Sequence, residues 1–131
     1  MSNAELVDRY LTAITDPATT DAALAGLVHP GYTFREWPNA INPAGSERDR
    51  AASLQGIAAS RALLAGHRFD VHEHVESGDT VISRMTWRGT VAIDAGPLKA
   101  GTELVAHVSQ HTTIRDGRIF RTESFDCYEP F

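Results

Sequence analysis

The chain has 131 residues, of which 42% are hydrophobic and 22% are charged, and its formal net charge is −5 at pH 7. This length and composition fit one globular domain with a hydrophobic core. The negative charge argues against nucleic acid or an anionic membrane as a partner, and no apolar run reaches the roughly 20 residues of a membrane span. Cys127 is the single cysteine and the N-terminus lacks a secretory signal pattern, so we expect a cytoplasmic protein without a disulfide.

Three helices are predicted in the first half of the chain. Ser2 and Glu5 have the spacing of a capping box in front of an apolar stripe, and Asp16-Pro17 ends this first helix. Residues 21–28 predict a second, short helix. The aromatic residues at 32–37 predict a strand, and residues 38–45 predict a loop. A third, longer helix is predicted from a cap at Ser46 to Gly66.

From residue 67 onward the hydrophobic residues alternate with period two, which predicts four long antiparallel strands. The first two of these join near residues 77–79. A two-residue turn there would pair Glu73 with Arg84, whereas a three-residue turn pairs hydrophobic residues with one another, such as Phe69 with Trp87. Because strand register follows the hydrophobic pattern, we expect the three-residue turn, with Glu73 on the otherwise apolar face.

Asp116-Gly117 predicts a two-residue hairpin turn between the last two strands, because a type I′ turn needs positive φ at both central residues. Counting outward from this turn, His107 faces Asp126. Side chains alternate between the two faces of a strand, so one face of this hairpin carries seven polar residues. They are His107, Ser109, His111, Thr113, Thr122, Ser124 and Asp126.

The pair of His107 and Asp126 has two interpretations. A carboxylate beside an imidazole stabilises its charged form and fixes one tautomer, which suits proton transfer near neutral pH. The alternative is a cross-strand polar pair that contributes about 0.2–1 kcal/mol to the sheet. Helices followed by a run of strands predict an α+β fold, with the sheet curling over the helices.

The order of elements and several short strings resemble the SnoaL-like branch of the nuclear transport factor 2-like superfamily, which contains polyketide cyclases and ketosteroid isomerases. The strings are Arg9-Tyr10-Leu11, Glu36-Trp37-Pro38, Trp87-Arg88-Gly89 and Asp116-Gly117-Arg118-Ile119, and the likeness covers essentially the whole chain. The resemblance implies a single SnoaL-like domain over residues 1–131. It also implies a cone-shaped, curved antiparallel sheet wrapped over three N-terminal helices, with an apolar pocket on its concave face.

The resemblance implies roles for individual residues. Tyr10 falls where ketosteroid isomerases keep a tyrosine that donates to an oxyanion. On the last strand of the isomerases, the pocket residues occupy the same alternate positions as Asp126. The resemblance therefore implies that the face carrying His107 and Asp126 points into the pocket. Two positions depart from the family pattern, because Trp37 stands at the position of the isomerase base and Ser109 or Gln110 at that of a second acid.

The same parity leaves an apolar face on the outside of the last hairpin, and we expect a homodimer through this outer sheet face. Its residues are Ala106, Val108, Ile114, Ile119 and Phe125. Among the remaining candidates, Glu36 ends the first strand next to a loop. It is expected to act as a base with a raised pKa, or else to hydrogen-bond to the loop through Asn39.

We therefore expect a pocket for a small apolar molecule with His107, Asp126, Glu36 and Tyr10 as catalytic residues. The expected pocket wall consists of Trp37, Asn39, Glu73, Met85, Trp87, Ser109, Thr122 and Ser124. One hypothesis is a cofactor-free isomerase, cyclase, hydrolase or lyase that acts on an apolar cyclic substrate. The other is a non-catalytic ligand-binding or dimerisation module. No phosphate-binding loop, nucleophile elbow or dinucleotide fingerprint occurs, and we expect no cofactor and no metal.

Overall fold

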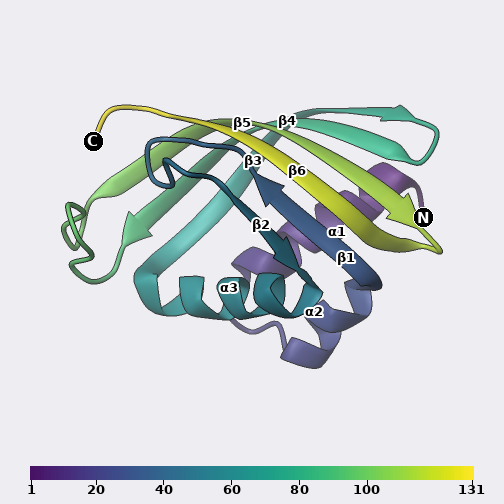
Figure 1. Cartoon of the computed structure of the whole chain (residues 1–131), viewed down its shortest axis with the longest axis horizontal. Coiled ribbons are helices and arrows are strands. Elements are labelled where there is room, and N and C mark those ends of the chain that lie inside the picture. Colours follow the sequence, from purple (N-terminus) through teal and green to yellow (C-terminus); the bar gives the residue numbers. More distant parts are fainter.

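Three helices lie on one side of a curved six-stranded sheet in the computed structural model, which describes residues 1–131 (Figure 1). The sheet bends over the helices, so its concave face and the helices enclose the interior. The predicted α+β fold with a curved sheet over three N-terminal helices is therefore confirmed.

The helices begin at caps that satisfy their first backbone N–H groups. α1 (Asn3–Thr15) starts with the predicted capping box, in which the Ser2 hydroxyl accepts from the Glu5 N–H and the Glu5 carboxylate accepts from the Ser2 N–H. α2 (Asp21–Leu27) is capped by Thr20, and α3 (Arg50–Leu63) by Asp49. None of the three helices combines the length and the hydropathy of a membrane-crossing segment.

The third helix starts later than the sequence predicts. Ser46 belongs to a short strand, β2 (Ser46–Asp49), which pairs antiparallel with β1 (Val28–Glu36). The predicted cap at Ser46 is wrong, because residues 46–49 form backbone hydrogen bonds with β1 and the Asp49 side chain accepts from the Ala52 N–H instead. β1 also starts earlier than predicted, at Val28.

The remaining strands are β3 (Leu64–Ser77), β4 (Thr80–Val91), β5 (Glu103–Arg115) and β6 (Arg118–Tyr128). The sheet order is β2-β1-β6-β5-β4-β3, and β3 to β6 pair antiparallel as predicted. β1 joins β6 in parallel, so the ends of these two strands lie side by side, with Glu36 opposite Ser124.

A β-bulge at His72 determines the register of β3 and β4. The turn has two residues, Gly78 and Asp79, yet Phe69 still pairs with Trp87, because the register shifts by one residue at His72. The two alternatives of the sequence analysis therefore apply to different parts of the same hairpin. Glu73 pairs with Arg84 and lies 3.5 Å from it on the outer face, so its predicted place on the inner face is wrong.

A second bulge, at Phe120, changes the register of β5 and β6. The predicted two-residue turn is present and Asp116 has a φ of 54°, but Phe120 is an extra residue on β6. Beyond the bulge, His107 pairs with Cys127 and Val108 pairs with Asp126. His107 and Asp126 therefore lie on opposite faces of the sheet, and the predicted pair is wrong.

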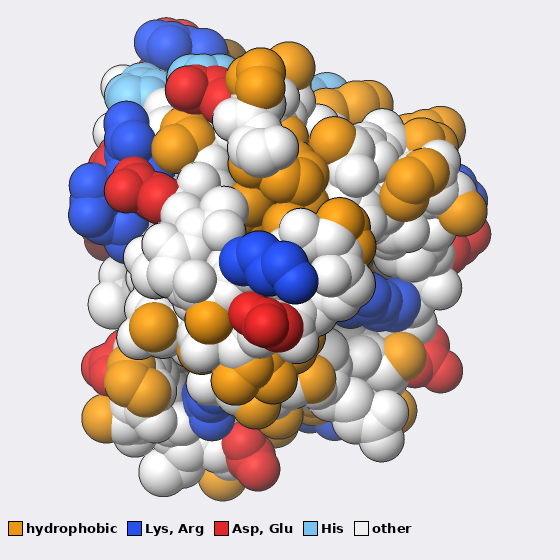
Figure 2. Space-filling model, turned by 90° about the vertical axis from the view of Figure 1, so that its left-hand side faces the viewer, with side chains coloured by type: hydrophobic (Ala, Val, Ile, Leu, Met, Phe, Trp, Pro, Cys, Tyr) orange, Lys and Arg blue, Asp and Glu red, His pale blue; other side chains and the backbone are white.

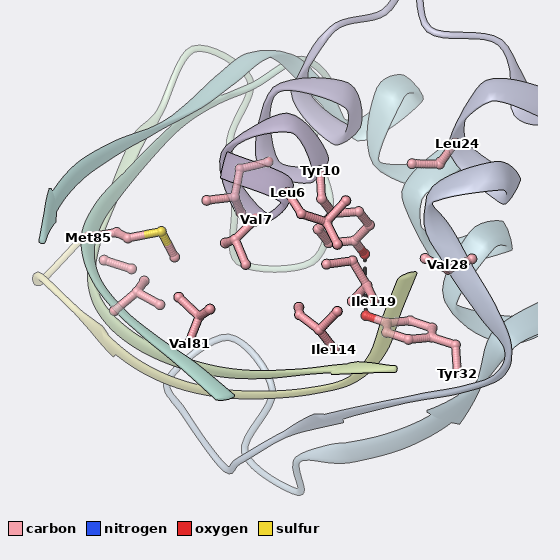
Figure 3. Close-up of a cluster of buried hydrophobic side chains, with 13 residues drawn as sticks. Leu6, Val7, Tyr10, Leu24, Val28, Tyr32, Val81, Met85, Ile114 and Ile119 are labelled. Atoms are coloured by element: carbon pink, nitrogen blue, oxygen red, sulfur yellow. Dashed lines mark hydrogen bonds between the residues drawn. The ribbon is translucent and has the colours of Figure 1, made fainter. Parts of the chain in front are cut away.

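Because of the bulge at Phe120, the even-numbered residues of β5, and not the odd-numbered ones, share the inner face with Asp126. Ala106, Val108, Ile114 and Ile119 belong to the main hydrophobic core, which fills the space between the concave face and the helices (Figure 3). Their predicted place on an outer dimer face is therefore wrong. Phe125 does lie on the outer face, where 39% of it is exposed.

Candidate functional site

One cavity of about 250 Å³ lies between the concave face of the sheet and helices α1 and α3. The exposed surface of its wall is mostly apolar, and the apolar side chains include Ile14, Phe34, Ile57, Leu64, Phe69 and Trp87. The polar and charged groups in the wall are Tyr10, Tyr32, Glu36, Arg48, Ser53, Ser60, His67, Gln110, Ser124, Asp126 and Tyr128. The end of the molecule nearest the C-terminus shows hydrophobic side chains above and below its centre, with basic and acidic side chains between them (Figure 2).

Asp126 is the carboxyl group in this pocket with a strongly shifted pKa. Burial in the pocket raises the pKa of Asp126 to about 6, and the negative charge of Glu36 adds to the effect. The Ser124 hydroxyl donates to Asp126 Oδ1 at 3.0 Å and opposes the rise by stabilising the carboxylate. A carboxyl group with this pKa exchanges a proton near neutral pH, as a general acid or base requires.

Glu36 stands next to Asp126 because β1 and β6 run parallel. It pairs with Ser124, two residues before Asp126, and lines the same pocket. Asn39 Nδ2 donates to Glu36 Oε2 at 2.8 Å, and the Asn39 side-chain carbonyl accepts from the backbone of the following loop. Glu36 therefore lines the pocket and is anchored to the loop by Asn39, as the second interpretation expects. Its role as a base stays a prediction.

Two tyrosine hydroxyls meet between α1 and β1. The hydroxyl oxygens of Tyr10 and Tyr32 are 3.3 Å apart, and both side chains are buried (Figure 3). Burial raises the pKa of Tyr10 and of Tyr32, and burial together with Asp126 and Glu36 raises the pKa of Tyr128. All three phenols stay protonated at neutral pH, so they are available as hydrogen-bond donors.

His67 lies in the pocket wall as an oriented, neutral imidazole. Its Nδ1 accepts from Trp87 Nε1 at 3.0 Å, and burial lowers the pKa of His67. Gly89 on the same strand as Trp87 leaves room for the indole, because a Cβ at this position would lie 2.6 Å from the ring. This packing holds Trp87 across the pocket wall.

The structure brings together Asp126, Glu36, Tyr10, Trp87 and Ser124 of the predicted site residues. The others lie elsewhere. His107 is on the outer face, where its Nε2 is 2.9 Å from Glu129 Oε2. Glu73, Ser109 and Trp37 are also outside the pocket, Asn39 lies in the loop behind Glu36, and Met85 and Thr122 are buried in the interior away from the pocket wall.

Several residues that line the pocket were not predicted from the sequence. Tyr32 has the same strand parity as Phe34 and Glu36, so the period-two pattern contained a signal for it. Gln110 was one of two candidates for a family acid position, and the bulge at Phe120 selects it over Ser109. Arg48 had no such signal, because residues 46–49 were expected in a helix. No three His, Cys, Asp or Glu side chains lie together in an arrangement that could bind a metal ion.

Comparisons with known proteins agree with this architecture. The family model of the SnoaL-like domain matches residues 7–122. No curated protein matches the chain. Among solved structures, IdmH of Streptomyces antibioticus, a proposed polyketide cyclase, is 22% identical with a TM-score of 0.78, covering 96% of this chain and 92% of IdmH.

Two further structures show the same likeness. A proposed SnoaL-like polyketide cyclase from Shewanella denitrificans is 11% identical with a TM-score of 0.76, covering 95% of this chain and 89% of that protein. A protein with a ketosteroid isomerase-like fold from Catenulispora acidiphila, in complex with trimethylamine, is 18% identical with a TM-score of 0.72, covering 95% and 86%. At these identities the similarity is one of fold.

Proposed function

The chain belongs to the family of SnoaL-like domains, and we propose that it is a cofactor-free acid/base enzyme that moves a proton next to a carbonyl group of an apolar cyclic substrate. The observation that carries this proposal is Asp126, a carboxyl group with a pKa of about 6 in a largely hydrophobic pocket. A base of this kind is matched to proton transfer near neutral pH.

In the proposed reaction the Asp126 carboxylate takes a proton from the carbon next to the carbonyl. The carbonyl oxygen becomes an enolate oxygen, and the Tyr10 hydroxyl, supported by Tyr32, donates a hydrogen bond to it. Protonated Asp126 then returns the proton to a different carbon in an isomerisation. In a cyclisation, the enolate carbon instead attacks a second carbonyl of the same molecule, and Asp126 protonates the new alkoxide. Asp126 thus takes the role that the sequence analysis gave to His107.

Glu36 supports the proton transfer through its charge. Its carboxylate lies close enough to raise the pKa of Asp126, and Asn39 holds it in place. The hydrophobic wall fits an apolar ring, and the proposed cyclase activity of IdmH and of the Shewanella protein is in keeping with carbonyl chemistry in this fold.

We further propose a cytoplasmic homodimer that forms through the outer sheet face, although by different residues from those first expected. An outer-face patch runs across the sheet from Trp37 and Phe125 through His111 to Ile82 and Val75. Phe125 stacks on Trp37 with ring centroids 5.8 Å apart, and both are more than one third exposed. Hydrophobic side chains gathered on one face favour association with a second copy.

Deuterium uptake tests the proposed chemistry without knowledge of the natural substrate. The parent protein, Asp126→Asn and His107→Ala are incubated in D₂O with a panel of cyclic ketones and diketones, and exchange at the carbon next to the carbonyl is followed by NMR. We expect catalysed exchange in the parent protein, a loss of roughly 10²- to 10⁴-fold in Asp126→Asn, and no change in His107→Ala.

Ligand binding is measured on the same three proteins. Binding of the ketones without catalysed exchange in the parent protein would show the alternative function, a non-catalytic ligand-binding module. Equal exchange rates in the parent protein and in Asp126→Asn would contradict the role of Asp126.

A further inference from the structure

Arg48 is the one arginine in the pocket wall, and its guanidinium makes no hydrogen bond or ion pair. Other arginines nearby are engaged: Arg35 pairs with Glu47, and Arg50 and Arg61 donate to backbone carbonyls of Ala25 and Thr19. Arg48 is half-buried as a residue, and a guanidinium that gives up water contacts without a protein partner loses hydration without compensation. Its five N–H donors are therefore available to a molecule in the pocket.

Two residues of α3, Gly56 and Ser53, line the pocket with Arg48, and together with Arg48 they form a polar corner of the pocket. A Cβ on Gly56 would lie 2.6 Å from Arg48 Nη1, so the missing side chain provides the room that the guanidinium occupies. One helical turn earlier, Ser53 lines the same pocket and is only 6% exposed, and its hydroxyl has no hydrogen-bond partner. A buried hydroxyl in the pocket wall that has no partner inside the protein is free to hydrogen-bond to a ligand.

This corner is separated from the proton-transfer site. Arg48, Phe34 and Thr122 are aligned across β2, β1 and β6, whereas Asp126 lies four residues further along β6. At about 3.3 Å per residue and about 4.8 Å per strand, the two backbone positions are well over 10 Å apart. On β1, Phe34 stands beside Arg48 and Glu36 stands midway between Arg48 and Asp126 in the register. A molecule that reaches both ends therefore passes Glu36 as well as the apolar side chains of the wall.

We propose that the ligand is an apolar ring that carries a carboxylate, which Arg48 binds with its guanidinium and Ser53 with its hydroxyl. A carboxylate matches the planar, two-pronged donor geometry of arginine. The apolar ring then lies along the hydrophobic wall, and the opposite end of the ligand points towards Asp126. This inference rests on the proposed function only in taking the ligand to be apolar and small.

Two probes of the same shape test the inference by isothermal titration calorimetry. 2-Naphthoate carries a carboxylate, and 2-naphthamide is its neutral counterpart. We expect the full chain to bind the naphthoate more tightly, and Arg48→Gln to weaken naphthoate binding roughly ten- to a hundred-fold while naphthamide binding stays the same. Arg35→Gln removes an arginine from the neighbouring strand, outside the pocket, and serves as the matched control.

Gly56→Ala provides a second variant that keeps the charge of Arg48. The added methyl group displaces the guanidinium from its position beside α3, so we expect naphthoate to lose part of its advantage over naphthamide. Equal affinity of the parent protein for both probes, or an equal loss of both in Arg48→Gln, would overturn the carboxylate inference and leave the apolar pocket intact. Failure of both probes to bind the parent protein would overturn the apolar pocket itself, and the carboxylate inference with it.

Discussion

Asp126 combines a functional group with surroundings that oppose its charge. Its pKa in the folded protein is about 6, against an ordinary value of 3.8, and burial is the main cause. Between these two values the folded state binds more protons than the unfolded state. The contribution of Asp126 to the free energy of unfolding therefore falls as the pH rises from about 4 to about 6 and stays constant above that range. The total loss from this group is at most about 3 kcal/mol.

Replacement of this residue should therefore stabilise the protein. Asp126→Asn keeps an oxygen that can accept from Ser124 and removes the buried charge. We expect its free energy of unfolding to exceed that of the parent protein by about 1–3 kcal/mol at pH 7.5, and the difference to shrink towards zero near pH 4.

Urea denaturation at the two pH values measures this difference. His107→Ala serves as a control on the outer face, where no comparable gain is expected at pH 7.5. If Asp126→Asn is as stable as the parent protein at both pH values, the buried carboxylate of Asp126 does not lower the free energy of unfolding.

At the scale of single elements, two one-residue bulges decide what the pocket contains. The bulge at His72 sends Glu73 outward, and the bulge at Phe120 brings Asp126 to the inner face of the sheet, opposite to the face of His107 on β5. Each bulge reverses the parity of every residue beyond it, because side chains alternate along a strand. The pocket therefore depends on two local irregularities as much as on the regular strands.

The start of α3 offers a test at this scale. The Asp49 side chain accepts from the Ala52 N–H as the N-cap, whereas Ser46 lies in β2, outside the helix. We expect Asp49→Ala to lower the free energy of unfolding by about 1 kcal/mol and Ser46→Ala to have a smaller effect. Urea denaturation of the two variants measures the difference, and a larger loss for Ser46→Ala would be inconsistent with the cap at Asp49.

At the scale of the whole molecule, the curved sheet has a concave face and an outer face with different compositions. The concave face holds the core and the pocket, and the outer face carries the patch of Trp37, Phe125, His111, Ile82 and Val75. A stable dimer buries about 800 Å² per partner, which a sheet face can supply. The proposed dimer would leave each pocket on the concave side of its own subunit.

Charge introduced into the outer-face patch tests this arrangement. We expect the parent protein to elute as a dimer in size-exclusion chromatography with light scattering, and Phe125→Lys to shift the equilibrium to the monomer by at least ten-fold in the dissociation constant. Ile93→Lys changes another exposed hydrophobic residue, 52% exposed and outside the sheet, and should leave the dimer intact. A parent protein that elutes as a monomer at all concentrations would refute the dimer.

Much of the fold was accessible from the sequence because its signals are local. The capping box at Ser2, the helix end before Pro17 and the turn at Asp116-Gly117 each depend on neighbouring residues, and the structure contains all three. The resemblance to SnoaL-like proteins added the pocket on the concave face. Tyr10, Glu36 and Asp126 were named from strand parity and family position, and they lie in one pocket.

The composition of the pocket was decided by tertiary structure. Asp126 faces Glu36 because β1 joins β6 in parallel, and it is separated from His107 because Phe120 adds one residue to β6. Arg48 enters the pocket only because residues 46–49 pair with β1 instead of extending α3. The sequence by itself determined most of the helices, strands and turns, since those preferences act over a few residues. Which residues face one another was left to the packing of distant strands, because a shift of one residue reverses every side chain beyond it at little local cost.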